Sequence, residues 1–173
     1  PAALRRHLGP GRRVLVLARD ADTPALVAAE LAAAGHSSAR LTVLEQLGGP
    51  AERLVTGVAA GWAEPPGDPL AVLALECGDG PALAVVPGLP DDAYASDGQL
   101  TKREVRAVTL ALLAPVPGAL LWDVGAGSGS VGIEWLRSHP ACRAIAVESH
   151  PERAATITAN AAALGVPALR VVT

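Results

Sequence analysis

The sequence predicts an α/β protein with two units in succession, and three observations lead to this prediction. Short runs rich in valine and leucine alternate with alanine- and leucine-rich segments of helical length. A stretch dense in glycine, proline and aspartate, residues 78–99, divides these runs into an earlier and a later set. In the later set, four glycines lie between an apolar run and a helical segment, within residues 120–135.

Composition indicates a globular chain and argues against several functions. Half of the 173 residues are apolar, which is enough to bury a core, and the formal charge is −3. Because the basic residues are scattered, neither nucleic acid nor a membrane surface is an expected partner. No apolar run approaches the roughly 18 residues that a membrane span needs. Cys77, Cys142 and the four histidines show no metal-binding spacing, so we expect buried thiols, no metal site and a cytoplasmic protein.

The first half predicts one helix among several strands. Asp22 and Thr23 are suited to cap the helix start, Pro24 suits its first turn, and Gly35 suits its end. Residues 52–62 have a mixed character that predicts no particular element. The expected strands lie at 13–18, 40–45 and 70–76, and the helix at 25–34.

The second half predicts a regular alternation of strands and helices. Thr101 and Glu104 have the spacing of a capping box, in which each side chain satisfies a free amide at a helix start. The helix that follows carries apolar residues on one face, namely Val105, Val108, Leu112 and Leu113. We then expect parallel βαβ units with strands at 119–124, 143–148 and 168–172 and helices at about 130–138 and 151–164.

The glycine-rich loop can be interpreted in two ways. From Gly127 to Gly132 it has the G-x-G-x-x-G pattern of a dinucleotide site, with Glu148 at the end of the next strand as the ribose acid. From Asp123 to Gly129 it is an acid followed by alternate glycines, which suits S-adenosylmethionine. A tight turn without a ligand is the third interpretation.

Charge favours the methyl donor. A dinucleotide would place its pyrophosphate at the helix start, where Asp123 would repel it. S-adenosylmethionine carries a sulfonium and an ammonium, which a nearby carboxylate stabilises. Glu148 does not discriminate, because both ligands contain a ribose whose hydroxyls can donate to one carboxylate.

Residues 91–173 resemble the precorrin methyltransferase domains of cobalamin biosynthesis. The resemblance rests on three stretches: DDAYASDGQLTKREVRAVTLALL, LLWDVGAGSGSVGIEW and AIAVESHPERAATITANAAALGV. It implies a Rossmann-like, class I S-adenosylmethionine-dependent fold with Glu148 as the ribose acid. It also places Asn160 in the helix that follows this acid.

Residues 12–76 are similar to the C-terminal half of a class III tetrapyrrole methylase, through TPALVAAELAAAGH, RLTVLEQLGGPAER and LAVLALE. The two domains in this order are the arrangement of the fused, decarboxylating precorrin-6Y methyltransferases. We therefore expect the C-terminal part of a methylase domain at 1–85 and the N-terminal part of the methyltransferase domain at 86–173. Both would be parts of a longer protein.

The resemblance implies a reaction and a set of contacts. The reaction is methylation of precorrin-6Y at carbons 5 and 15 with loss of the carbon-12 acetate carboxyl, and the family is generally multimeric, so a homo-oligomer is expected. Thr101 could bind the donor, cap its helix, or do both. The implied contacts to S-adenosylmethionine are Thr101, Asp123, Gly125, Ala126, Gly127, Ser128, Gly129 and Glu148.

Several functions stay open at this point. No side chain is identified as catalytic, and Arg103 and Arg106 could either grip a substrate carboxylate or form a solvated helix face. An NAD-dependent oxidoreductase is the main alternative activity. A non-catalytic scaffold is a second alternative, against which the cofactor glycines argue.

Overall fold

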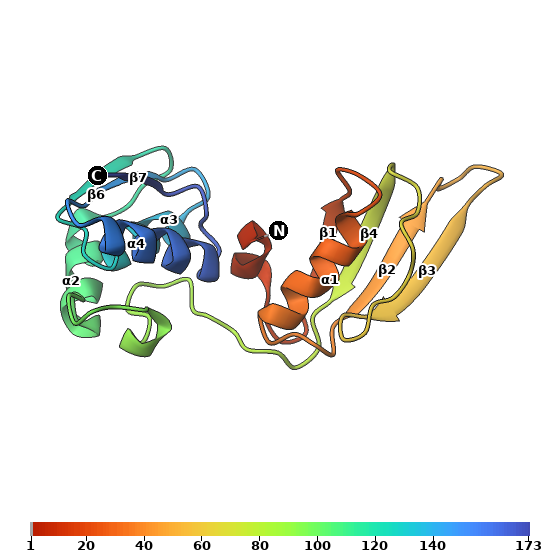
Figure 1. Ribbon diagram of the computed structural model, residues 1–173, viewed down its shortest axis with the longest axis horizontal. Helices are drawn as coiled ribbons and strands as arrows, with labels where there is room; N and C mark the ends of the chain where they lie inside the picture. Colours follow the sequence, from red (N-terminus) through yellow and green to blue (C-terminus); the bar gives the residue numbers. More distant parts are fainter. Residues whose placement is uncertain (1) are drawn as a thin grey trace. The chain divides into compact units, whose positions relative to one another are not determined.

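The computed structural model describes residues 2–173, which divide into two compact units, residues 3–82 and 83–173 (Figure 1). Each unit has its own sheet and its own hydrophobic core. Within the described residues, no helix has the length and apolar character needed to cross a membrane. The domain identities expected for residues 1–85 and 86–173 stay predictions.

The first unit is an antiparallel sheet with strand order β1-β4-β2-β3. β1 and β2 both pair with β4, which is therefore a central strand. The short helix η1 spans Ala2–His7 and precedes the sheet. The other elements are β1 (Arg13–Leu17), α1 (Thr23–Ala33), β2 (Arg40–Glu45), β3 (Arg53–Val58) and β4 (Ala71–Glu76).

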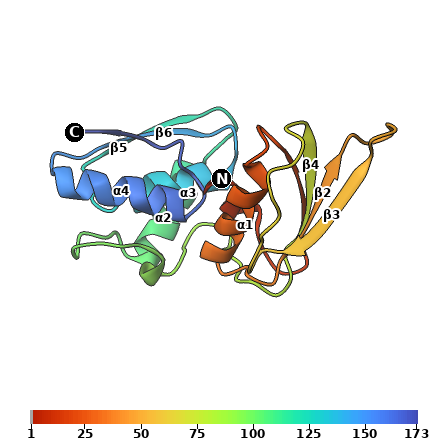
Figure 2. The same cartoon turned by 45° about the vertical axis from the view of Figure 1, so that its right-hand side comes forward.

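Helix α1 covers one face of this sheet (Figure 2). Val27, Ala28 and Leu31 of the helix are buried in one cluster with alternate residues of the two central strands, including Leu41 and Leu73. Cys77 is buried in the same cluster, and Cys142 is buried in the second unit, as expected for both thiols.

The ends of α1 follow the sequence signals in part. Pro24 lies in the first turn, and Gly35 takes a left-handed φ of 83° directly after the C-cap residue, as predicted. Asp22 is the N-cap residue, but its side chain makes no capping hydrogen bond. Thr23 instead accepts from the backbone N–H of Arg19 at 3.1 Å and that of Asp20 at 3.2 Å, which stabilises the turn before the helix.

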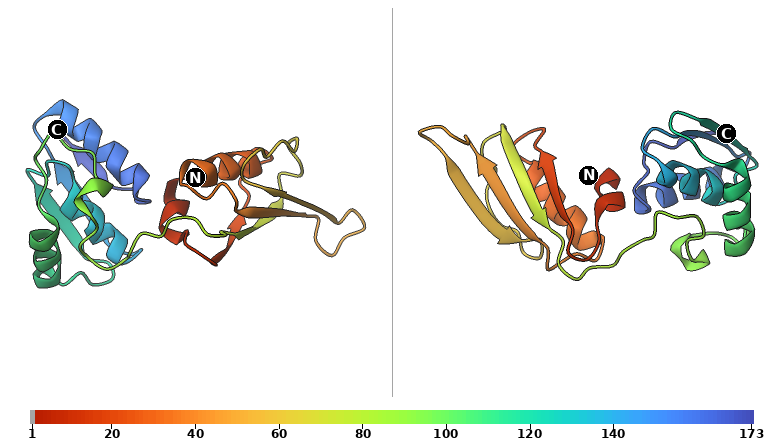
Figure 3. Two further views of the ribbon diagram at one scale, coloured as in Figure 1. Left: turned by 90° about the horizontal axis from the view of Figure 1, so that it is seen from below. Right: turned by 180° about the vertical axis from the view of Figure 1, so that it is seen from behind.

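The second unit contains a parallel sheet of three strands in the order β5-β6-β7. Helices α3 and α4 connect these strands and lie on the same face of the sheet (Figure 3). This alternation confirms the βαβ prediction. Before it come the short helix η2 (Asp91–Ala93) and α2 (Arg103–Leu113), and the alternating elements are β5 (Leu120–Val124), α3 (Ser130–Ser138), β6 (Arg143–Val147), α4 (Pro151–Ala163) and β7 (Arg170–Val172).

Residues 88–101, which we call the strap, are fixed to the second unit by a buried ion pair. Arg106 of α2 is fully buried, and its Nε donates to Glu134 of α3 at 2.6 Å. The same guanidinium donates to the backbone oxygen of Thr101 at 2.5 Å and to that of Leu89. Both ends of the strap are thus bound to one arginine.

Glu134 completes this network from the other side. Its carboxylate accepts from the backbone N–H of Gly88 at 2.6 Å and of Leu89 at 3.0 Å, and from the Tyr94 hydroxyl at 2.9 Å. Burial and the charge of Glu134 raise the pKa of the Tyr94 phenol, so this hydroxyl stays protonated as a donor. The Tyr94 ring lies over the guanidinium of Arg106 at 4.8 Å.

Two predictions for α2, the capping box and the role of Arg106, are wrong, and the apolar residues of this helix are not its buried ones. Lys102, not Thr101, is the N-cap residue of α2, and no side-chain capping bond forms, so the capping box is absent. The apolar residues Val105, Val108, Leu112 and Leu113 are exposed, and Leu110 and Arg106 form the buried face. Arg106 is therefore neither on a solvated face nor free to bind a substrate carboxylate, because its guanidinium is already bonded inside the unit.

Replacing Glu134 with glutamine should strongly destabilise the second unit. The substitution removes the buried counter-charge of Arg106 and leaves only the half-buried Asp91, 3.3 Å from its Nη1. Breaking a buried ion pair in this way typically costs about 3–5 kcal/mol. The control is the exposed Lys102, which pairs with the same Asp91 at 3.6 Å. Lys102→Ala should cost about 1 kcal/mol or less. Urea denaturation followed by circular dichroism measures both, and equal losses would contradict a dominant role for Glu134.

Candidate functional site

The glycine loop, residues 125–129, lies at the carboxyl end of β5, where parallel sheets bind their ligands. The backbone N–H groups of Gly125 and Ala126 both donate to the Val147 carbonyl at the end of β6, at 2.9 and 3.1 Å. Gly125, Gly127 and Gly129 all take positive φ values, between 58° and 77°. Only glycine adopts this repeated left-handed conformation readily, which explains the alternate glycines.

Glu148 holds the loop at the end of β6. Its buried carboxylate accepts from the backbone N–H of Gly127 at 2.9 Å and from that of His150 at 3.0 Å. The hydrogen bonds from His150 and Gly127 hold the pKa of the Glu148 carboxyl below its usual value. The side chain is therefore ionised at neutral pH, and each oxygen keeps a lone pair for a further donor.

Asp123 occupies the N-terminal end of α3. Its Oδ2 accepts from the backbone N–H of Gly132 at 3.0 Å, in the first turn of the helix. The N-cap residue Gly129 has no side chain to fill this role. Burial raises the pKa of the Asp123 carboxyl, and the bond from Gly132 opposes that rise. A negative side chain thus stands where a pyrophosphate would have to bind.

Two loop glycines are also required by close packing. A Cβ on Gly127 would lie 3.0 Å from the Gln99 carbonyl oxygen of the strap. A Cβ on Gly129 would lie 2.7 Å from the Ile157 side chain of α4. A Cβ on Gly125 would meet nothing within 4 Å, so the loop leaves open space at this residue.

Asn160 joins the loop to the strap and was not among the predicted site residues. Its Nδ2 donates to the backbone oxygens of Ser128 at 3.0 Å and of Ala95 at 2.9 Å. Its Oδ1 accepts from the Ala95 N–H at 3.0 Å. The resemblance placed Asn160 in the helix after the ribose acid, but a buried asparagine in a helix carries no sequence signal for these partners.

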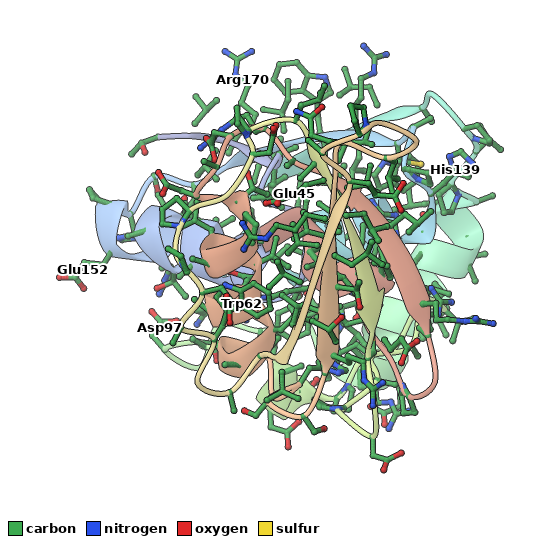
Figure 4. All side chains as sticks on the ribbon, turned by 90° about the vertical axis from the view of Figure 1, so that its right-hand side faces the viewer. Glu45, Trp62, Asp97, His139, Glu152 and Arg170 are labelled. Atoms are coloured by element: carbon green, nitrogen blue, oxygen red, sulfur yellow. The ribbon has the colours of Figure 1, made fainter. Side chains whose placement is uncertain are left out.

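A hollow of about 170 Å³ lies beside the loop, between the strap and the start of α4. Gly127 and Ser128 line it from the loop, and Asp97 lines it from the strap. Glu152 and Arg153 line it from α4, and Arg153 is paired with Asp97 at 2.7 Å. Asp97 and Glu152 are both labelled in Figure 4. The buried Ser128 Oγ has no hydrogen-bond partner within the described residues.

The structure brings most of the predicted donor contacts together. Asp123, the residues from Gly125 to Gly129, and Glu148 meet at the carboxyl ends of β5 and β6. Thr101 differs, because its side chain is exposed and its recorded contact is a backbone carbonyl bonded to Arg106. The described residues contain no group of side chains arranged to hold a metal ion.

Comparison with known proteins agrees with this geometry. Residues 92–173 match the model of the precorrin methyltransferase domain. That segment belongs to the precorrin methyltransferase family. Over 172 residues the chain is 48% identical to a precorrin-6Y C(5,15)-methyltransferase [decarboxylating] of Sinorhizobium sp, which covers 98% of this chain and 42% of that protein.

Two further similar proteins cover different shares of the chain. A protein of the same name from Mycobacterium tuberculosis is 46% identical over 159 residues, 90% of this chain and 40% of its own length. The crystal structure of the C-terminal domain of precorrin-6Y C5,15-methyltransferase from Rhodobacter capsulatus is 47% identical with a TM-score of 0.50, over 53% of this chain and 49% of that one. The chain spans between 40% and 42% of the length of these curated relatives.

Alanine at Gly129 should cost more stability than alanine at Gly125. Both glycines have similar left-handed φ values, 77° and 74°, so the backbone penalty of about 1–2 kcal/mol is shared. Only at Gly129 would the new methyl group also collide with Ile157. Overpacking should add at least about 1 kcal/mol, measured by urea denaturation. Equal losses for the two variants would show that the loop and α4 are not packed against each other.

Acid should destabilise the wild type more than a Glu148→Gln variant. The pKa of Glu148 is lowered in the folded state, so its ionised form stabilises the fold above the unfolded-state pKa of about 4.3. This stabilisation is lost as the pH falls through the lowered folded pKa, and glutamine has no such titration. Thermal melting between about pH 6 and pH 3 measures the difference. Glu152→Gln, which removes an exposed carboxylate of α4, is the control for the loss of one negative charge.

Proposed function

We propose that the protein is an S-adenosylmethionine-dependent methyltransferase of cobalamin biosynthesis that acts on precorrin-6Y. It would methylate carbons 5 and 15 and remove the carboxyl of the carbon-12 acetate. The names of the relatives, which align with nearly all of the chain, support this substrate and reaction. The observation that carries the choice of donor is Asp123 at the start of α3, beside a loop whose ribose acid is ionised.

The residues around the loop fit the methyl donor. Gly125 leaves room for a ligand against the backbone, and the Ser128 hydroxyl is buried without a partner. The Glu148 carboxylate can accept from both ribose hydroxyls in addition to its two backbone bonds. When bound, the donor supplies an electrophilic methyl group on a sulfonium. The residues that would hold it at the loop are Asp123, Gly125, Ala126, Gly127, Ser128, Gly129 and Glu148, and the contact proposed for Thr101 rests on the family resemblance.

An NAD-dependent oxidoreductase is disfavoured by the same loop. A dinucleotide needs the free N–H groups at the start of α3 for its pyrophosphate. Here the Gly132 N–H is bonded to Asp123 and the Gly127 N–H to Glu148. Two of the N–H groups at this position are thus already bonded to carboxylates of the protein.

The side chains of this chain would contribute to methyl transfer by positioning. The nucleophilic carbon belongs to an electron-rich macrocycle, so the transfer requires alignment at contact distance and exclusion of water more than a base. The strap lies against the loop at Gly127 and Gln99, where it can exclude water. In decarboxylation the C–C bond to the leaving carboxyl breaks, its electron pair enters the macrocycle, and a proton is taken up at carbon. We assign no side chain to that proton.

The first unit would be the C-terminal part of a tetrapyrrole methylase domain fused to the methyltransferase domain. Relatives that align with 90% or more of this chain support a fused arrangement. We also propose a cytoplasmic location and a homo-oligomeric assembly for the whole enzyme.

Calorimetric binding of S-adenosylhomocysteine and of NADH tests the choice of cofactor. We expect saturable binding of S-adenosylhomocysteine and no binding of NADH. Gly127→Ala should weaken that binding by about tenfold or more, because its Cβ would displace the strap at Gln99 and the loop itself.

Gly118→Ala is the matched control for this experiment. Gly118 also has a positive φ, 84°, but it precedes β5 and its Cβ would meet nothing within 4 Å. The backbone penalty of Gly118→Ala should be similar to that of Gly127→Ala, and its affinity for S-adenosylhomocysteine should equal that of the wild type. Binding of NADH in place of S-adenosylhomocysteine would contradict the methyltransferase proposal.

A further inference from the structure

Asn160 lies where three segments of the second unit meet. It belongs to α4 and is only 4% exposed. Its amide pairs with both the N–H and the carbonyl of Ala95 in the strap, and it also donates to the Ser128 carbonyl in the glycine loop. One side chain therefore fixes the position of the strap relative to the loop.

This position requires a side chain with two hydrogen-bond donors and one acceptor, and a side chain of the same size without them would not replace asparagine. Both N–H groups of the Asn160 amide are used, each by a backbone carbonyl, and the amide oxygen accepts the Ala95 N–H. A carboxylate of the same shape has no donor when ionised. It would face the carbonyl oxygens of Ala95 and Ser128 with negative charge, at the distance of a hydrogen bond.

The bond from Asn160 to the Ser128 carbonyl also bears on the Ser128 side chain. Ser128 Oγ is buried, lines the hollow beside the loop, and has no hydrogen-bond partner within the described residues. A buried hydroxyl without a partner is unfavourable, so a ligand that forms a hydrogen bond with it would gain affinity. The orientation of this hydroxyl depends on where the loop backbone is held.

We propose that Asn160 is a positioning residue for the methyl donor: it holds the strap and the glycine loop together so that Ser128 Oγ is presented to the ligand in the hollow. Asn160 makes no contact with the donor itself and acts through Ser128 and Ala95. This inference rests on the proposed function, because it takes the ligand of the loop to be S-adenosylmethionine.

Asn160→Asp tests the proposal through its dependence on pH. At about pH 8 the ionised carboxylate should weaken S-adenosylhomocysteine binding by about tenfold. At about pH 5.5 part of the affinity should return, because burial and the two carbonyls raise the pKa of the new carboxyl and its protonated form regains one donor. Glu148 stays ionised over this range because its pKa is lowered. Calorimetry on the wild type at both pH values supplies the reference.

Ala159→Asp is the matched control. It places the same charge on the neighbouring residue of α4, where the side chain is exposed. Its affinity should equal that of the wild type at both pH values. A purely structural loss would instead appear as a lowered melting temperature of Asn160→Asp without pH-dependent recovery of binding.

Ala95→Pro tests the hydrogen bond between Asn160 and Ala95 from the strap side. It replaces the first test if Asn160→Asp does not fold. It removes the N–H that Asn160 accepts, in an exposed residue that follows Tyr94, whose extended φ of −117° and ψ of 130° suit a following proline. Binding should weaken by about threefold or more. Wild-type affinity in this variant, or in Asn160→Asp at about pH 8, would overturn the role of Asn160 but leave the proposed function standing. A wild type that does not bind S-adenosylhomocysteine would overturn the proposed function and the inference with it.

Discussion

The arrangement of the second unit depends on the buried ion pair of Arg106 and Glu134. Neither charge is accessible to water, so each must be satisfied by hydrogen bonds, and the strap supplies them through its backbone. The strap has no long helix or strand of its own, and its apolar contribution to the core is small, chiefly Leu89 and Tyr94. The ion pair therefore holds the irregular strap in one conformation beside the glycine loop. Its hydrogen bonds join α2, α3 and the strap in one network. Because hydrogen bonds are directional, they fix the geometry of these segments in a way that apolar contacts do not.

The strap packs against the βαβ core at the glycine loop. Gly127 approaches the strap and Gly129 approaches α4, so the loop is packed between two segments that are far apart in the sequence. Asn160 then connects the same two segments by hydrogen bonds. Packing limits how far the backbone can move, and the amide determines where it rests. Together they explain why a loop rich in glycine, the most flexible residue, can still be held in one conformation.

Sequence patterns predicted the elements well and the strap poorly, for physical reasons. The strands and helices of both units follow apolar periodicity and glycine or proline signals, which are local properties of the chain. β3 was not predicted because it is an edge strand whose exposed side and Gly57 obscure any alternation. The capping box at Thr101 is absent, and the Thr101 carbonyl instead accepts a hydrogen bond from the buried Arg106, five residues further on, which local spacing could not indicate. Among site residues, Asp123, Glu148 and the loop glycines carry a motif, whereas Asn160 and Glu134 are defined only by partners distant in the sequence.

The distribution of donors and acceptors around the loop decides which ligands it suits. In an ordinary dinucleotide site the loop amides point at a phosphate and remain free until it binds. Here the amides of Gly125 and Ala126 bond to Val147, that of Gly127 bonds to Glu148, and that of Gly132 bonds to Asp123. These four donors are thus consumed within the protein, and two carboxylates with spare lone pairs lie beside the loop. Such a site offers acceptors, so it favours a ligand that brings hydroxyl donors and positive charge over one that brings a phosphate.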